Sequence, residues 1–180
     1  MNKRILYLTI YPELNDNLFN YEDLSIGCDL FDIYRDMHKY VTAESNYISS
    51  IFDKNTAYDS VYFQDLNKNS IKLLKHFVKK KVPCYLILLE SFAVIDPSIF
   101  KKYYKYFTKV FTWNPKLADE YGFSIFNIPN IISFSSVLTN KPVSFVQLSS
   151  NKLSNYPSEN YSLRKDVINF FESENYPFHF

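Results

Sequence analysis

Short apolar runs alternate along the chain with longer stretches in which apolar residues recur every three or four positions. The strongest run is Val82–Leu89 (VPCYLILL), whose apolar side chains would point to both faces of a sheet. This pattern is typical of a central parallel strand that is covered on both faces. Weaker runs, rich in β-branched and aromatic residues, predict further strands. They are Lys3–Ile10, Tyr47–Phe52, Ser60–Phe63, Lys109–Trp113, Phe123–Ile128 and Val143–Leu148.

The stretches between these runs predict helices with one apolar face. One begins at Asp65 or Asn67 and ends in three lysines at 79–81, which suit a helix C-terminus. Pro97 suits a first helical position, and Gly122 suits a helix end. Because strands and helices alternate, the sequence predicts an α/β fold with a Rossmann-like parallel sheet and flanking helices. The other predicted helices are Cys28–Val41, Ile99–Phe107, Pro115–Tyr121 and Ser158–Glu174.

The chain length suggests about one domain, since it has 180 residues. We expect a first domain over residues 1–135, which holds most of the predicted strands and helices. A stretch rich in Asn, Ser and Pro then leads into residues 136–180, which predict a linker, one strand and one helix. One such unit cannot bury a core of its own. We therefore expect it to pack on the first domain, or to open a second domain that is truncated here.

Composition narrows the classes of function. Lys and Arg number 20 and Asp and Glu 19, for a net charge of +1, which argues against a nucleic-acid binder that relies on bulk charge. With two glycines, the chain has no glycine-rich phosphate loop. Two distant cysteines and three scattered histidines form no familiar metal motif, so we expect no metal and a reducing, cytoplasmic compartment. No apolar run approaches the roughly 20 residues of a transmembrane helix. Peripheral association with a membrane stays open.

A carboxylate directly follows the strongest predicted strand. In open parallel sheets, ligands bind outside the carboxyl ends of the strands, and Glu90 lies at that edge. A carboxylate in this place is suited to accept a proton as a general base. The alternative is that Glu90 only ends the strand in water, or caps the helix behind Pro97.

Two further features are candidates for ligand contacts. Trp113, the only tryptophan of the chain, is suited to stack on the apolar face of a sugar; the alternative is an ordinary packing aromatic. Ser150 and Asn151 follow a predicted strand, and Arg164 lies early in the next helix. A polar loop before a helix N-terminus, with an Arg in that helix, can bind an anion. The alternative is a solvated loop. The run 103–107 resembles the basic and aromatic pattern of single-strand nucleic-acid binders, but its spacing favours an amphipathic helix.

Two separated segments of the chain carry distinctive motifs. In Cys84–Asp119 a predicted strand ends in Glu-Ser, and the segment KYFTKVFTW precedes a short predicted helix. In Phe145–Phe171 the motif SSNK is followed by an Arg and by two Phe residues. These segments, in this order, resemble the family 10 glycosyltransferases, which are α-1,3-fucosyltransferases. The resemblance implies inverting transfer of L-fucose from GDP-fucose to a glycan hydroxyl, typically on N-acetylglucosamine, without a metal in the chemistry. It also implies a two-domain GT-B fold.

On the acceptor side, the resemblance implies that Glu90 is the catalytic base. Ser91 and Trp113 would line the cleft that holds the acceptor glycan. This sequence differs from the family's Glu-Ser-Pro motif, because Phe92 stands in place of the proline. We therefore expect the loop after Glu90 to have a shape of its own.

On the donor side, the resemblance implies that Arg164 contacts the GDP diphosphate and that Ser150 and Asn151 lie beside it. The family's later residues for fucose and diphosphate have no counterpart in this sequence. We therefore expect this chain alone to be inactive unless another polypeptide supplies the missing donor half. The alternative function is a non-catalytic carbohydrate-binding or interaction module that keeps the scaffold.

Overall fold

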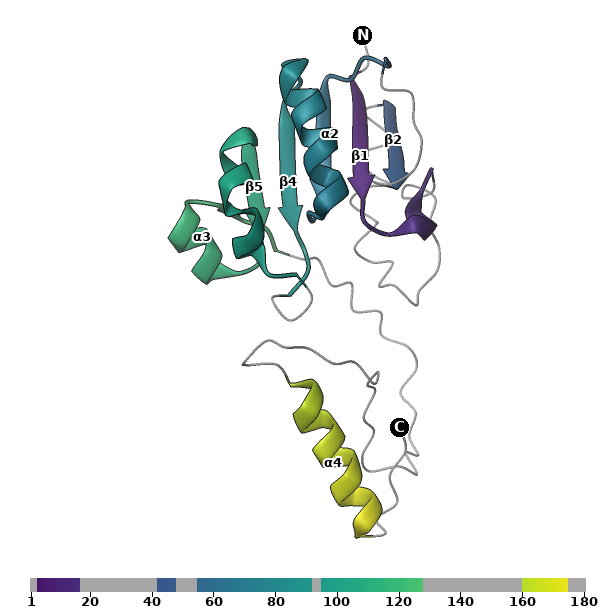
Figure 1. The fold of residues 1–180 in the computed structure, drawn as a ribbon, viewed down its shortest axis with the longest axis vertical. Coiled ribbons are helices and arrows are strands. Elements are labelled where there is room, and N and C mark those ends of the chain that lie inside the picture. Colours follow the sequence, from purple (N-terminus) through teal and green to yellow (C-terminus); the bar gives the residue numbers. More distant parts are fainter. Residues whose placement is uncertain (1–2, 17–41, 48–54, 92–94, 128–159, 175–180) are drawn as a thin grey trace, which may run out of the picture. The chain divides into compact units, whose positions relative to one another are not determined.

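The structure is a computed structural model that describes residues 3–16, 42–47, 55–91, 95–127 and 160–174. The described residues belong to two units, each taken here by itself. The first unit, called the sheet unit, contains all the described strands (Figure 1). The second includes the helix α4 (Tyr161–Ser173) and the short segments at residue 91 and at residues 95–96.

Six strands form one parallel sheet in the order β2-β1-β3-β4-β5-β6. The strand order reverses between β1 and β3, as in doubly wound α/β folds. The predicted parallel α/β sheet with flanking helices is therefore confirmed. The strands are β1 (Arg4–Thr9), β2 (Thr42–Tyr47), β3 (Ser60–Gln64), β4 (Cys84–Leu88), β5 (Lys109–Thr112) and β6 (Ser124–Ile125).

One face of the sheet carries aliphatic and Phe side chains and packs against two helices. The α-helix α2 (Lys68–Lys79) and the 3-10 helix η3 (Pro97–Tyr106) lie next to each other over this face (Figure 1). Leu74 and Phe77 of α2 are buried, and the ring of Phe63 meets that of Phe107 edge to face at 5.5 Å. Burial of this apolar surface drives the packing of the helices. The buried strand residues on this face are Leu6, Leu8, Val61, Phe63, Cys84, Leu86, Leu88, Val110 and Thr112.

The opposite face carries a row of three tyrosines across neighbouring strands. Tyr7, Tyr62 and Tyr85 are paired in register on β1, β3 and β4. Their rings stack at centroid separations of 5.6 Å and 4.8 Å. Such cross-strand aromatic pairs stabilise a sheet and fix its register. Burial, with a smaller contribution from Tyr85, raises the pKa of Tyr62 above its ordinary value.

Helix α2 begins after Asn67, one of its two predicted starts. The Asn67 side chain accepts hydrogen bonds from the amides of Asn69 and Ser70, and the Ser70 hydroxyl accepts one from the Asn67 amide. This capping box satisfies amides that the first helical turn leaves without partners. Asp65, the other predicted start, lies before the cap and has a different role, described below.

Most of the remaining predictions for the described residues are confirmed. The predicted strands Lys3–Ile10, Val82–Leu89, Lys109–Trp113 and Phe123–Ile128 are present with shorter bounds, and Ser60–Phe63 is present with one more residue. Helices are also present at Pro97, at Pro115 and before Glu174. Residues 103–107 form the amphipathic pattern expected, with Tyr104 and Phe107 buried and Tyr106 exposed. No helix in the described ranges is long and apolar enough to cross a bilayer.

One strand of the sheet was not predicted. Strand β2 pairs with β1 over Thr42–Tyr47, whereas the predicted strand Tyr47–Phe52 lies outside the described residues except for Tyr47. Edge strand β2 (TAESNY) is polar, so its apolar content does not mark it, and its pairing with β1 decides its place. The predicted helix Cys28–Val41, the predicted strand Val143–Leu148 and most of residues 136–180 lie outside the described residues.

Residues next to the short helix α3 (Pro115–Tyr121) determine where it begins and ends. The Asn114 side chain accepts hydrogen bonds from the amides of Lys116 and Leu117, at 2.9 Å and 3.4 Å. Gly122 ends the helix in the left-handed region, at a φ of 69°. Trp113 directly precedes Asn114, the N-cap of this helix.

We expect Gly122→Ala to lower the free energy of unfolding by about 1 kcal/mol, because a Cβ is disfavoured at a positive φ. A Cβ at residue 122 would meet no atom within 4 Å, so backbone strain is the cause. Gly122→Asn is the matched control, since Asn tolerates this region better, and should lower it by less. Urea unfolding measures all three proteins. Equal losses for Ala and Asn would contradict the assigned cause.

Candidate functional site

Four side chains follow four strands at the same edge of the sheet. Tyr11 lies beyond β1, Asp65 beyond β3, Glu90 beyond β4 and Trp113 beyond β5. Carboxyl ends of parallel strands share one edge, where open α/β sheets bind their ligands. Hydrogen bonds between these residues and the segment Leu89–Glu90 show that the edge is one connected site.

Asp65 joins the ends of β3 and β4. Its Oδ1 accepts hydrogen bonds from the amides of Leu89, at 3.0 Å, and Glu90, at 3.2 Å. Its own amide donates to the Ile87 carbonyl at 2.9 Å. The residue has a φ of 54°, a left-handed conformation that Asp tolerates better than most residues. The backbone on either side of Glu90 therefore depends on this carboxyl group.

The Asp65 side chain is buried to an unusual degree for a carboxyl group. The residue is 1% exposed, and Oδ2 has no hydrogen-bond partner among the described residues. Burial raises the pKa of Asp65 to about 7, the amides of Glu90 and Leu89 lower it, and the nearby charge of Glu90 raises it further. Desolvation disfavours the charged form of a buried acid. The group therefore titrates near neutral pH.

Glu90 is half-buried and is held by a phenol from another strand end. The Tyr11 hydroxyl donates a hydrogen bond to Glu90 Oε1. Tyr11 is itself positioned by its backbone, whose amide donates to Oγ1 of the buried Thr9 at 3.1 Å. The carboxylate is thus oriented at the edge of the sheet and stays accessible from outside.

Trp113 is attached to the same segment through its ring. The indole N–H donates to the Leu89 carbonyl at 3.0 Å, while 39% of the residue is exposed. This exposure contradicts a role as an ordinary core aromatic. An indole fixed at one end and exposed on the rest can act as an apolar platform next to Glu90.

The other predicted site residues belong to the second unit or lie outside the described residues. Arg164 is in the first turn of α4, exposed, with its guanidinium 5.7 Å from the ring centroid of Tyr161. It belongs to the second unit, as does Ser91, whose carbonyl accepts a hydrogen bond from the Ile95 amide at 2.9 Å. Ser150 and Asn151 lie outside the described residues.

Tyr11 and Asp65 were not predicted to be site residues. A signal for both was present, because each residue follows a predicted strand at the position where Glu90 follows its own. The apolar run Lys3–Ile10 leads into Tyr11, and Ser60–Phe63 leads almost directly into Asp65. Because carboxyl ends of parallel strands share one edge, the predicted strand ends alone would have grouped Tyr11 and Asp65 with Glu90.

The described part of the chain contains no group of three His, Cys, Asp or Glu residues placed to hold a metal ion. Comparisons of the chain with protein-family models, with curated proteins and with solved structures find no match.

We expect the buried Asp65 carboxyl to make stability depend on pH. Its pKa is raised from 3.8 to about 7, so its contribution to the free energy of unfolding is complete below 3.8 and is lost as the pH rises toward 7. The loss should reach several kcal/mol, since one pKa unit corresponds to about 1.4 kcal/mol. Asp65→Asn keeps an oxygen for both amides and should remove this loss.

Urea unfolding at a series of pH values measures this effect as the difference between the two proteins. Asp119→Asn, at an exposed residue of α3, is the matched control and should follow the unsubstituted protein. Parallel curves for the unsubstituted protein and Asp65→Asn would show that the carboxyl group does not titrate as described.

Proposed function

We propose that the protein transfers L-fucose from GDP-fucose to a hydroxyl of a glycan that contains N-acetylglucosamine, with inversion. The observation that carries this proposal is the half-buried Glu90 carboxylate, oriented by Tyr11 beside the exposed Trp113 ring. The resemblance of Cys84–Asp119 and Phe145–Phe171 to family 10 fucosyltransferases supplies the reaction and the donor. The first of these segments contains both Glu90 and Trp113.

In this proposal the acceptor sugar lies against Trp113, with one hydroxyl directed at Glu90. Oε2 of Glu90 takes the hydroxyl proton while the acceptor oxygen forms its bond to the anomeric carbon of fucose. The bond from that carbon to the GDP phosphate oxygen breaks on the opposite side, and GDP leaves with the electron pair. A general base must reach the proton it removes, at about 2.6–3.2 Å between heavy atoms.

Tyr11 and Asp65 are positioning residues in this scheme. The Tyr11 hydroxyl donates to Oε1, which turns the carboxylate and leaves Oε2 for the acceptor. Asp65 holds the backbone amides of Leu89 and Glu90, and so fixes where the Glu90 side chain begins. A shift of 1 Å at a reacting group can lower a rate by about a hundredfold.

The donor side of the proposal uses the second unit. Arg164, with Ser150 and Asn151, would contact the diphosphate of GDP-fucose, because a guanidinium fork matches phosphate oxygens. The sheet unit would be the acceptor domain of a GT-B fold, and α4 would belong to the beginning of the donor domain.

A carbohydrate-binding module without catalysis is the second candidate function, and the exposed Trp113 platform favours it. A sugar can stack on this ring whether or not a donor is present. The two functions differ in the need for the Glu90 carboxylate, because sugar binding without transfer requires no base.

We expect Glu90→Gln to lower kcat by about 10²–10⁴-fold, because it removes the proton acceptor, with little change in the acceptor KM. The assay measures fucose transfer from GDP-fucose to an N-acetylglucosamine-containing oligosaccharide. The chain is combined with the donor domain of a family 10 enzyme.

Glu120→Gln, an exposed carboxylate of α3, is the matched control and should leave kcat unchanged. Equal turnover by Glu90→Gln and the unsubstituted protein would remove Glu90 from the role of base. Saturable binding of the oligosaccharide with no transfer in any combination would establish the binding module instead.

A further inference from the structure

Helices α2 and η3 carry lysines and no acidic residues. The segments KNSIKLLKHFVK and PSIFKKYYKY contain no Asp or Glu. The exposed lysines of the two helices form a set that we call the lysine face. It consists of Lys68, Lys72, Lys75 and Lys79 on α2 and Lys101, Lys102 and Lys105 on η3.

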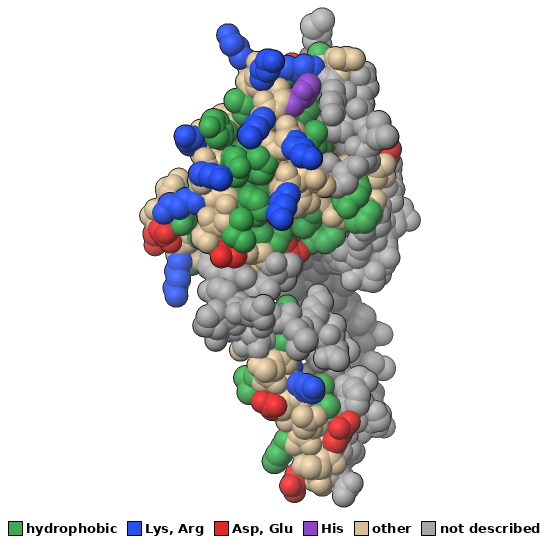
Figure 2. Space-filling model, viewed as in Figure 1, with side chains coloured by type: hydrophobic (Ala, Val, Ile, Leu, Met, Phe, Trp, Pro, Cys, Tyr) green, Lys and Arg blue, Asp and Glu red, His purple; other side chains and the backbone are tan. Residues whose placement is uncertain are grey.

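The positive charge of the lysine face is local and not a property of the whole chain. The net charge of the protein is only +1, so the compensating carboxylates lie on other parts of the chain. Figure 2 shows lysine side chains spread over the face formed by α2 and η3. The ion pair recorded among the described residues joins Arg4 and Glu44, so none of the seven lysines is paired with a carboxylate there. Such a one-sided field attracts an anionic surface.

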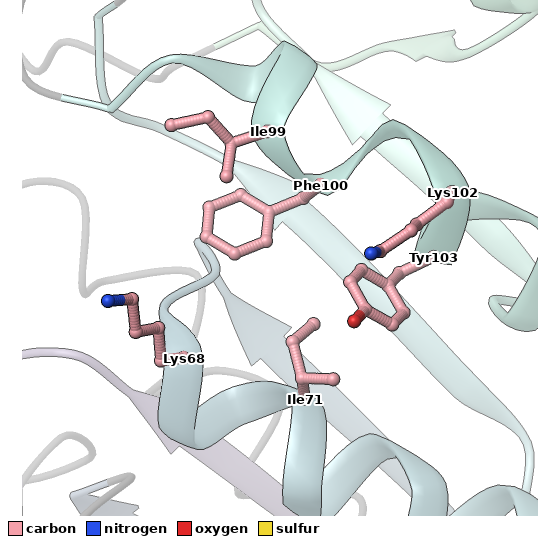
Figure 3. Close-up of a pocket in the computed structure, with 6 residues that line it drawn as sticks. All are labelled: Lys68, Ile71, Ile99, Phe100, Lys102 and Tyr103. Atoms are coloured by element: carbon pink, nitrogen blue, oxygen red, sulfur yellow. The ribbon is translucent and has the colours of Figure 1, made fainter.

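Apolar side chains lie among these lysines. A cavity of about 230 Å³ between the two helices is lined by Lys68, Ile71, Ile99, Phe100, Lys102 and Tyr103. Figure 3 shows Phe100 and Ile71 on its two walls, with Lys68 and Lys102 on either side. Ile99 is 65% exposed and Tyr106 is 44% exposed. The cavity includes none of the four side chains of the site at the sheet edge.

We propose that the lysine face docks on a membrane surface that contains anionic lipids. The lysine ammonium groups would contact the headgroup phosphates, while their methylene chains and the side chains of Ile99 and Tyr106 enter the boundary with the acyl chains. Basic residues around exposed aliphatic and aromatic side chains are the combination that lies in a membrane interface. This docking does not require fucosyl transfer.

The composition of the face favours lipid over nucleic acid. Neither α2 nor η3 contains an arginine, although arginine is the side chain that grips phosphates of nucleic acids in a bidentate way. The most exposed apolar residue is the aliphatic Ile99, and Tyr106 is the only exposed ring that the two helices offer for a base to stack on. Tyr104 and Phe107 are buried in the core.

The experiment measures binding of the full chain to vesicles of phosphatidylcholine, with and without phosphatidylglycerol. We expect binding only when the anionic lipid is present, with a decrease as salt is added. The triple substitution Lys68→Gln, Lys72→Gln and Lys102→Gln should weaken binding by roughly a hundredfold, at about 1 kcal/mol for each lysine near an anionic surface. The matched control replaces the exposed lysines 3, 116 and 165 by Gln and should bind as the unsubstituted protein does.

A second variant separates a membrane from a nucleic acid. Ile99→Ser should weaken vesicle binding and leave the weak binding of a single-stranded RNA oligonucleotide unchanged. Circular dichroism confirms that each variant is folded, as expected for exposed positions. The proposal is overturned if neutral and anionic vesicles bind equally, if the two triple variants bind equally, or if the RNA binds more tightly than the anionic vesicles.

Discussion

The hydrogen bonds that Asp65 accepts from the amides of Leu89 and Glu90 are the interaction on which the sheet edge depends. A hydrogen bond contributes about 0.5–1.5 kcal/mol when its acceptor is neutral and more when the acceptor is charged, so the two bonds fix the end of β4 against the end of β3. The same segment carries the other contacts, because the Leu89 carbonyl accepts from Trp113 and the Glu90 carboxylate accepts from Tyr11. Hydrogen bonds to the segment Leu89–Glu90 therefore connect the residues that follow four strands.

The position of Asp65 at the sheet edge lowers the stability of the fold. Asp65 is held at a positive φ, and its second carboxyl oxygen is buried without a hydrogen-bond partner among the described residues. Burying an unsatisfied polar oxygen is unfavourable, and the raised pKa of Asp65 expresses the same cost. Buried titratable groups with raised pKa values cluster at functional sites. The cost is understandable if the position of Glu90 matters more than the stability of the edge.

The central part of the fold could be predicted from the sequence because burial on both faces produces continuous apolar runs, as in Val82–Leu89. A local signal also predicted the end of α3, since Gly122 acts within the last turn. The polar edge strand Thr42–Tyr47 could not be placed in this way, because its pairing with β1 decides its position. Glu90 and Trp113 were assigned to the site. Tyr11 and Asp65 were not, because their contacts with Leu89 and Glu90 connect residues far apart in the sequence.

The most direct test of a sugar site at this edge uses the fluorescence of Trp113, the only tryptophan of the chain. The account predicts that an N-acetylglucosamine-containing oligosaccharide changes the emission in a saturable way. It also predicts that Asp65→Ala, which removes the acceptor for both amides of the Leu89–Glu90 segment, abolishes the response while the protein stays folded at low temperature. An emission spectrum that does not change at any oligosaccharide concentration, in protein shown to be folded, would contradict the account.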